Sequence, residues 1–119
     1  MKDVCFVTRT NDLLKEYESA IEERGLQTYF IRRSESEDRR TPGLRLATMH
    51  RVKGLEFDRV IIAGLNDGIM PYESQESYSS DPAVRQDSEV RERALLYVAA
   101  TRAKKEVLVT SFGKISKFL

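Results

Sequence analysis

Tryptophan is absent from this chain of 119 residues, and cysteine occurs once, at Cys5. One cysteine cannot form an internal disulfide, so the fold must be stabilised by an apolar core. A chain of this length buries about two thirds of its unfolded surface on folding, and we expect a single domain over residues 1–119. Cys5 lies in an apolar run, which predicts a small buried side chain in a reducing, cytoplasmic setting.

Long hydrophobic runs and an excess of charge are also missing. No stretch approaches the roughly 20 apolar residues of a membrane span, and no signal peptide precedes the first apolar run, so we expect no membrane contact. The 20 basic residues nearly balance the 19 acidic ones, for a net charge of +1. That balance argues against a stand-alone, high-affinity nucleic-acid binder, whose affinity comes from many phosphate contacts. It permits light binding with help from another domain.

Several catalytic signatures are absent. The sequence has no G-x-x-x-x-G-K-[ST] loop to hold phosphates and no adjacent Asp-Glu pair to hold Mg²⁺. His50 is the one histidine, which is too few for a metal cluster, and no nucleophile motif accompanies it. The chain therefore lacks a complete site for nucleotide hydrolysis, and we expect no metal site.

Short apolar runs without alternation predict strands that are covered on both faces of a mostly parallel sheet. They fall at residues 4–8, 26–31, 44–48, 60–64 and 106–111. Between the first two, residues 11–24 carry apolar side chains at helical spacing, with Thr10 or Asn11 as cap and Gly25 as terminator. The order strand, helix, strand predicts an α/β fold.

A second helix is predicted to begin at Ser88, with Glu89 and Glu92 in its first turn, where the helix dipole favours negative charge. Lys104 and Lys105 are expected at its end. Its expected buried face comprises Val90, Ala94, Leu95 and Val98.

Two polar connections complete the pattern. Residues 32–43 end in Pro42-Gly43, a turn signal, and are too few to hold a further subdomain. Residues 72–87 are rich in Ser, Glu, Asp and Gln and have no sustained period, which predicts a mobile surface loop.

The most informative stretch runs from Leu44 to Pro71, where two apolar runs flank a polar junction. Because ligand sites of α/β proteins form in crevices at strand ends, we interpret this junction as part of a site. It reads His50-x-x-Lys53-Gly54-Leu55-Glu56-Phe57 and, after the next run, Gly64-Leu65-Asn66-Asp67-Gly68-Ile69-Met70-Pro71.

These residues resemble motif V of the UvrD/Rep-like superfamily 1 DNA helicases. Glu92-Arg93-Ala94-Leu95-Leu96-Tyr97-Val98-Ala99-Ala100-Thr101-Arg102-Ala103 resembles motif VI, and Val7-Thr8-Arg9-Thr10-Asn11 resembles motif IV. Ser116-Lys117-Phe118-Leu119 is similar to the tail of the same domain. Three motifs and the tail occur in the family's order over nearly the whole chain.

The resemblance implies a three-layer RecA-like (P-loop NTPase-like) domain with a mostly parallel sheet of about five strands. It would be the second motor domain, 2A, of an ATP-dependent helicase that moves 3′ to 5′ on DNA. The large 2B insertion between motifs IV and V would be absent at about residues 32–43. The phosphate-binding loop and the Mg²⁺ ligands would belong to an N-terminal RecA-like domain, so the fragment alone should be inactive.

The resemblance also implies site roles. Arg102 and Arg9 would contact the γ-phosphate of ATP as arginine fingers, and Glu56 would hold its ribose. Arg9, Glu56 and Arg102 should then converge on one rim of the sheet. Lys53 and Gly54 would lie beside the nucleotide, and the residues facing single-stranded DNA would be Thr48, His50 and Arg51.

Without the resemblance, each of these residues has a simpler explanation. Arg102 could merely neutralise a helix C-terminus, Arg9 and Lys53 could be solvated, and Glu56 could be a surface carboxylate. A stand-alone, non-catalytic module that binds nucleic acid or a partner is the main alternative function. A phosphoacceptor receiver domain fits poorly, because Arg9-Thr10-Asn11 stands where its acidic pair is needed.

Overall fold

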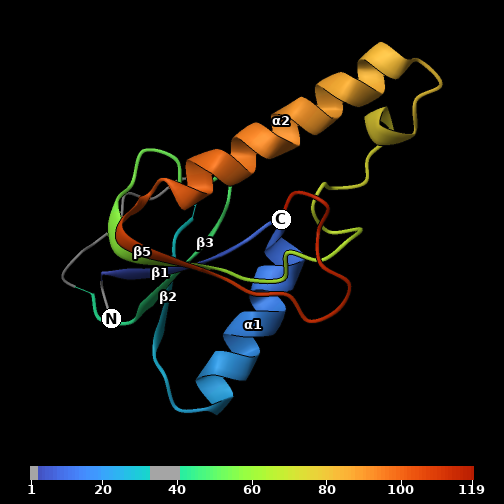
Figure 1. Ribbon diagram of the computed structural model, residues 1–119. Coiled ribbons are helices and arrows are strands. Elements are labelled where there is room, and N and C mark those ends of the chain that lie inside the picture. The colour runs from blue at the N-terminus through green and yellow to red at the C-terminus, as the bar shows by residue number, and fades with distance from the viewer. Residues whose placement is uncertain (1–2, 33–40) are drawn as a thin grey trace.

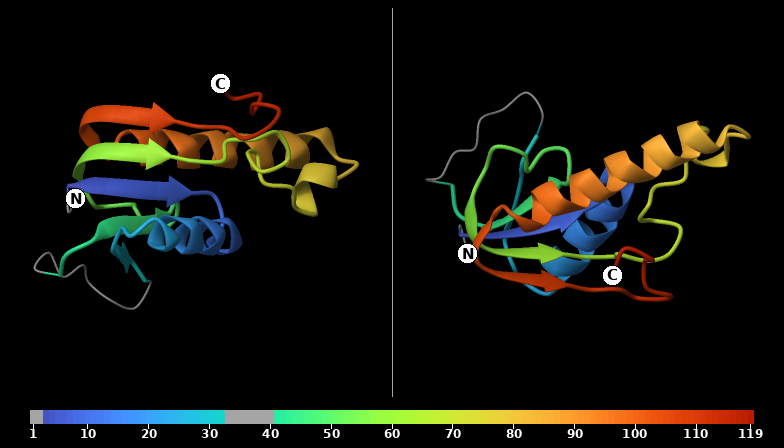
Figure 2. Two further views of the ribbon diagram at one scale, coloured as in Figure 1. Left: turned by 90° about the horizontal axis from the view of Figure 1, so that it is seen from below. Right: turned by 45° about the horizontal axis from the view of Figure 1, so that its top comes forward.

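The computed structural model describes residues 3–32 and 41–119. Five strands form one sheet in the order β2-β3-β1-β4-β5, and every neighbouring pair is parallel (Figures 1 and 2). The strands are β1 (Val4–Thr8), β2 (Thr28–Phe30), β3 (Leu44–Thr48), β4 (Phe57–Ile62) and β5 (Ala103–Val109). The α-helices in the described ranges are α1 (Asn11–Glu23) and α2 (Pro82–Ala100), with a short 3₁₀ helix, η1 (Glu76–Tyr78).

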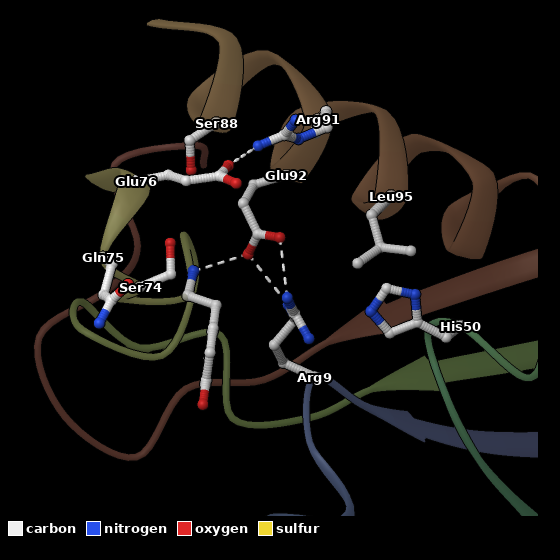
Figure 3. A pocket seen from close by; sticks show the side chains of 10 residues that line it. Arg9, His50, Ser74, Gln75, Glu76, Ser88, Arg91, Glu92 and Leu95 are labelled. Carbon is white, nitrogen blue, oxygen red and sulfur yellow. Dashed lines mark hydrogen bonds and ion pairs between the residues drawn. The ribbon is translucent and has the colours of Figure 1, made fainter. Parts of the chain in front are cut away.

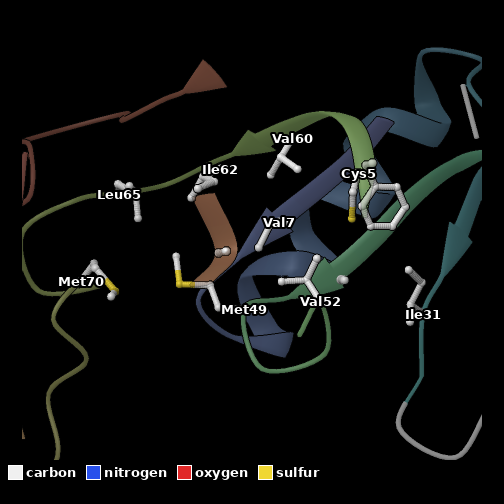
Figure 4. Close-up of a cluster of buried hydrophobic side chains, with 12 residues drawn as sticks. Cys5, Val7, Ile31, Met49, Val52, Val60, Ile62, Leu65 and Met70 are labelled. Atoms are coloured by element: carbon white, nitrogen blue, oxygen red, sulfur yellow. The ribbon is translucent and has the colours of Figure 1, made fainter. Parts of the chain in front are cut away.

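The two helices cover opposite faces of the sheet. Along β1, Cys5 and Val7 pack in the cluster that α2 joins through Ala99, whereas Phe6 packs in the cluster that α1 joins through Leu14. Successive side chains of a strand point to opposite faces, so the two clusters lie on either side of β1. Figure 4 shows the cluster that contains Cys5 and Val7. The predicted three-layer α/β architecture is confirmed.

The first strand and helix form as their residues predict. The Leu13 amide donates to the Thr10 side-chain oxygen at 3.2 Å and so caps α1. The ring of Tyr17 packs against Phe6, with centroids 4.9 Å apart. Beyond the helix end, Gly25 takes a φ of +86°, a conformation that costs glycine little.

The start of the second helix was predicted wrongly. α2 begins at Pro82, not Ser88, so residues 82–87 of the predicted loop are its first turns. The Asp81 carboxylate caps it by accepting from the Ala83 amide at 2.9 Å, and proline suits the first helical position because its missing N–H needs no partner there. The rest of that connection contains η1.

The predicted face and end of this helix were also partly wrong. Val90 is 55% exposed and Ala94 is exposed, while the buried positions are Ser88, Glu92 and Ala99. Lys104 and Lys105 do not close the helix. Both lie in β5, which begins at Ala103.

The remaining strands differ from prediction at their ends. β4 begins at Phe57 rather than residue 60, β5 at Ala103 rather than residue 106, and β2 is shorter than residues 26–31. The expected absence of an inserted subdomain concerns a connection of which residues 33–40 lie outside the described ranges.

The C-terminal tail packs beside the loop that follows β4. The Ser116 amide donates to the Leu65 carbonyl at 2.9 Å, and the Ser116 hydroxyl donates to the Met70 carbonyl. Phe118 packs against the α2-side core, but Leu119 is 53% exposed. Within the described ranges, neither α-helix has the length and apolar character needed to cross a bilayer.

Phe57→Ala should lower the free energy of unfolding by about 3–5 kcal/mol, because this ring is 1% exposed and its removal leaves a cavity in the α2-side core. Phe112→Ala is the matched control. Its ring is 63% exposed, so we expect a change of about 0.5 kcal/mol or less. Urea unfolding followed by circular dichroism measures both variants. Equal losses would contradict the assignment of the core.

Candidate functional site

The predicted site residues lie at opposite ends of the parallel strands. We call the side where the strands end the carboxyl edge and the side where they begin the amino edge. Arg9 follows the carboxyl end of β1, whereas Glu56 and Arg102 directly precede the amino ends of β4 and β5. Strands of 5 and 6 residues rise about 3.3 Å per residue, which separates the edges by about 17–20 Å. The prediction that Arg9, Glu56 and Arg102 converge on one rim is therefore wrong. The connection from β3 to β4 crosses from one edge to the other, so Glu56 lies far from His50.

At the carboxyl edge, Arg9 is bound to Glu92 of α2 (Figure 3). Its Nε donates to Oε1 and its Nη2 to Oε2, each at 2.9 Å. The two side chains are only 12% and 11% exposed. A bidentate pair of this kind compensates the guanidinium charge and fixes its plane.

Tyr72 completes the Arg9–Glu92 cluster. Its amide donates to Glu92 Oε1 at 2.6 Å, and the Arg9 guanidinium lies 4.7 Å from the centroid of its ring. Three segments far apart in sequence thus meet at one carboxylate: the end of β1, the loop after β4 and α2.

His50 borders the same cluster and lines a cavity of about 530 Å³ with Arg9, Glu92 and Tyr72 (Figure 3). Partial burial is the main cause that lowers the pKa of His50 below its usual value. The positive charges of Arg9 and then Arg51 lower the pKa further, and Glu92 opposes them. The ring is thus biased toward its neutral form.

Thr48 and Arg51 lie in the same turn but differ in access. Thr48 is 5% exposed, and its carbonyl accepts from the amides of Arg51 and Val52 at 3.0 and 3.1 Å. Arg51 is half-buried. The structure thus brings His50 and Arg51 to the carboxyl edge beside Arg9, with Thr48 beneath them.

At the amino edge, Arg102 is held by the end of α2. Its Nε donates to the Val98 carbonyl at 3.1 Å and its Nη2 to the Thr101 hydroxyl at 3.4 Å. Its carbonyl accepts from the Phe57 amide at 2.9 Å, which ties it to the start of β4. Among the described residues, no carboxylate lies within ion-pair distance of this guanidinium.

Glu56 adjoins this arginine and faces solvent. Its side chain is 66% exposed, and its one ion pair in the described ranges is with Lys104, at 3.9 Å. Lys53 and Gly54 are also exposed. Gly54 has a φ of +83° and open space where a Cβ would stand, so its backbone is accessible. The residues described include no group of three His, Cys, Asp or Glu side chains that could hold a metal ion.

Glu92 is a residue of the candidate site that the sequence analysis did not predict. It was assigned to a first turn, where it would only complement the helix dipole. The signal that could have found it is the stripe Ser88, Glu92, Leu95 and Ala99, whose helical spacing places a carboxylate on the buried face. A carboxylate on such a face requires a partner.

The family model described as the UvrD-like helicase C-terminal domain matches residues 11–114. The chain belongs to the UvrD-like helicase C-terminal domain family. The resemblance predicted from the sequence is thereby confirmed.

Individual relatives of this UvrD-like domain are known ATP-dependent DNA helicases. Rep of Escherichia coli K12 is 36% identical over 80 residues, which are 67% of this chain and 10% of that protein. UvrD2 of Mycobacterium bovis is 38% identical over 88 residues, which are 71% of this chain and 12% of that protein. The chain thus spans about a tenth of the length of these relatives.

A solved structure supports the fold of the domain. The C-terminal domain of a possible DNA helicase from Lactobacillus plantarum WCFS1 superposes with a TM-score of 0.64 at 22% identity. The match covers 98% of this chain and 60% of that one.

The pKa of His50 should lie below 6.5 in the folded chain, because burial and the Arg9 charge disfavour its protonated form. It is the one histidine of the sequence, so its ring protons can be followed by NMR during a pH titration without assignment ambiguity. Protonation of His50 therefore favours the unfolded state. The free energy of unfolding should be highest above the pKa that His50 has in the unfolded chain, and it should decrease as the pH falls through the lower pKa of His50 in the folded chain. A pKa at or above 6.5 would contradict this environment.

Proposed function

We propose that this UvrD-like domain is the C-terminal motor domain of an ATP-dependent 3′–5′ DNA helicase. Its amino edge would face ATP held by an N-terminal RecA-like domain, and its carboxyl edge would face single-stranded DNA. One observation carries the proposal. Arg102 presents a fixed guanidinium that no described carboxylate compensates, next to the exposed Glu56.

The contrast between Arg102 and Arg9 supports the assignment of the nucleotide edge. A guanidinium bound only to a helix carbonyl and a hydroxyl retains its charge for phosphate oxygens, whereas Arg9 is already paired with Glu92. We therefore assign the γ-phosphate contact to Arg102 alone. Arg9 lies at the other edge, too far away to contact the same phosphate.

The neighbours of Arg102 suit the rest of a nucleotide. A carboxylate accepts hydrogen bonds from both hydroxyls of a ribose, and Glu56 is free enough in solvent to do so. Lys53 and the accessible backbone at Gly54 would lie beside it. When bound, ATP supplies the phosphoryl group for hydrolysis. Its Mg²⁺ would take its ligands from the N-terminal domain.

The DNA edge is assigned to His50 and Arg51, with Thr48 beneath them. A neutral imidazole can lie against a sugar or base, and a half-buried arginine can reach a phosphate. The net charge of +1 predicts weak, salt-sensitive binding by this domain alone. Weak binding suits a translocating motor, which must release the strand repeatedly.

Arg102→Ala should lower DNA-stimulated ATP hydrolysis by about 10³- to 10⁵-fold, the usual effect of losing an arginine finger. The assay requires a protein in which this domain is fused to, or mixed with, a domain that carries a phosphate-binding loop. The chain alone should show no activity above background.

Arg59→Ala is the matched control for the ATPase assay. Arg59 is a solvent-exposed arginine of β4 that pairs with Glu106 at 3.0 Å, and its removal should leave the rate within about twofold. An unchanged rate in Arg102→Ala would remove the proposed finger. ATP hydrolysis by the chain alone that Arg102→Ala abolishes would show that the site is complete without another domain.

A further inference from the structure

Glu92 is buried, charged and unused by the proposed nucleotide contacts. It is 8% exposed, and both of its carboxylate oxygens accept hydrogen bonds. The donors come from two separate segments, the Arg9 guanidinium and the Tyr72 amide. A buried ion pair adds little net stability, because desolvation of both charges offsets their attraction. Its more distinctive effect is to fix the orientation of the groups it joins.

Tyr72 is held to this carboxylate directly and through Arg9. Its amide is bound to Glu92, and one face of its ring lies under the guanidinium that Glu92 holds. Tyr72 is 45% exposed and lines two cavities, of about 530 and 510 Å³. His50 borders the first cavity, and Thr10 and Gly68 border the second. Displacement of Tyr72 would therefore reshape both hollows of the carboxyl edge.

We infer that Glu92 is a positioning residue of the DNA-facing edge, acting through Arg9 and the Tyr72 main chain to hold the surface that receives single-stranded DNA. This inference rests on the proposed function. Glu92 itself does not touch DNA, since its oxygens are occupied and its side chain is 11% exposed.

The electrostatic setting favours orientation over charge as the role of this pair. Arg9 and Glu92 neutralise each other, so the pair adds little attraction for phosphate. The charged groups that influence His50 are Arg9, Glu92 and Arg51. Loss of the Glu92 charge would leave Arg9 without its partner and increase the positive charge at this edge. If the pair acted only through its charge, a variant without this carboxylate would bind DNA more tightly. If Glu92 positions the DNA-facing surface, the same variant would bind DNA more weakly.

The test compares Glu92→Gln, Arg9→Gln and the double variant in the 119-residue chain, using a fluorescein-labelled oligo-dT at low salt and anisotropy as the readout. Each single variant should bind about tenfold more weakly. The double variant should bind no more weakly than either single, because both changes remove one interaction. Glu89→Gln is the matched control. It makes the same change on the same helix, in a carboxylate paired with Arg93 and Lys117, and should bind at least as tightly as the wild type.

NMR titration of His50 separates positioning from a general loss of structure. Glu92→Gln should lower the pKa of His50 further, and Arg9→Gln should raise it, because the two charges act on the ring in opposite directions. Unfolding would instead return the pKa of His50 to that of a free histidine in both variants.

Unchanged or tighter DNA binding by Glu92→Gln, or additive losses in the double variant, would overturn the inference. Absence of binding by the wild-type chain would overturn the proposed DNA edge itself, and the inference with it. That failure is recognisable because it appears without any substitution.

Discussion

The parallel alignment of all five strands is the constraint on which the rest of this structure depends. Parallel strands need helical or long connections that return each time to the same starting edge, and these connections cover both faces of the sheet. The central strands are accordingly mostly apolar, and the candidate site residues lie at the two edges. Residues that precede a strand gather at one edge, and residues that follow a strand gather at the other.

The arginines at the two edges have different binding partners. At the carboxyl edge, Arg9 is locked in a bidentate pair and lies over an aromatic ring. At the amino edge, Arg102 is held only by hydrogen-bond acceptors of a helix end. The first arrangement neutralises the cation and makes it structural. The second fixes the cation in place while keeping its charge available, which is what a phosphate ligand requires.

Much of the fold follows from local sequence. β1, β3 and α1 were predicted closely because short apolar runs, a threonine cap and a terminal glycine each act within a few residues. The start of α2 was missed because Pro82 was interpreted as a loop residue, although proline after an aspartate cap favours the first turn of a helix. The family of the domain was also recognisable, since its motifs are short and occur in order.

The distribution of the site could not be predicted in the same way. Whether Glu56 lies near His50 or across the sheet depends on the course of the connection between β3 and β4, which no local pattern records. The pairing of Arg9 with Glu92 joins residues 83 positions apart, so it exists only once the sheet and α2 have packed. Sequence similarity predicted a nucleotide contact for Arg9, whereas the tertiary structure pairs it with Glu92 at the other edge of the sheet.

One helix therefore positions residues at both edges. Glu92 lies in the middle of α2, and Arg102 follows just past its end. An α-helix turns about 100° per residue, so the angular offset between these two side chains is set by the number of residues that separate them. Substitutions in that interval leave this offset unchanged. Insertion or deletion of one residue would rotate Arg102 about the helix axis by more than a quarter turn relative to Glu92. Among homologues, the number of residues in this interval should therefore be constant even where its composition differs.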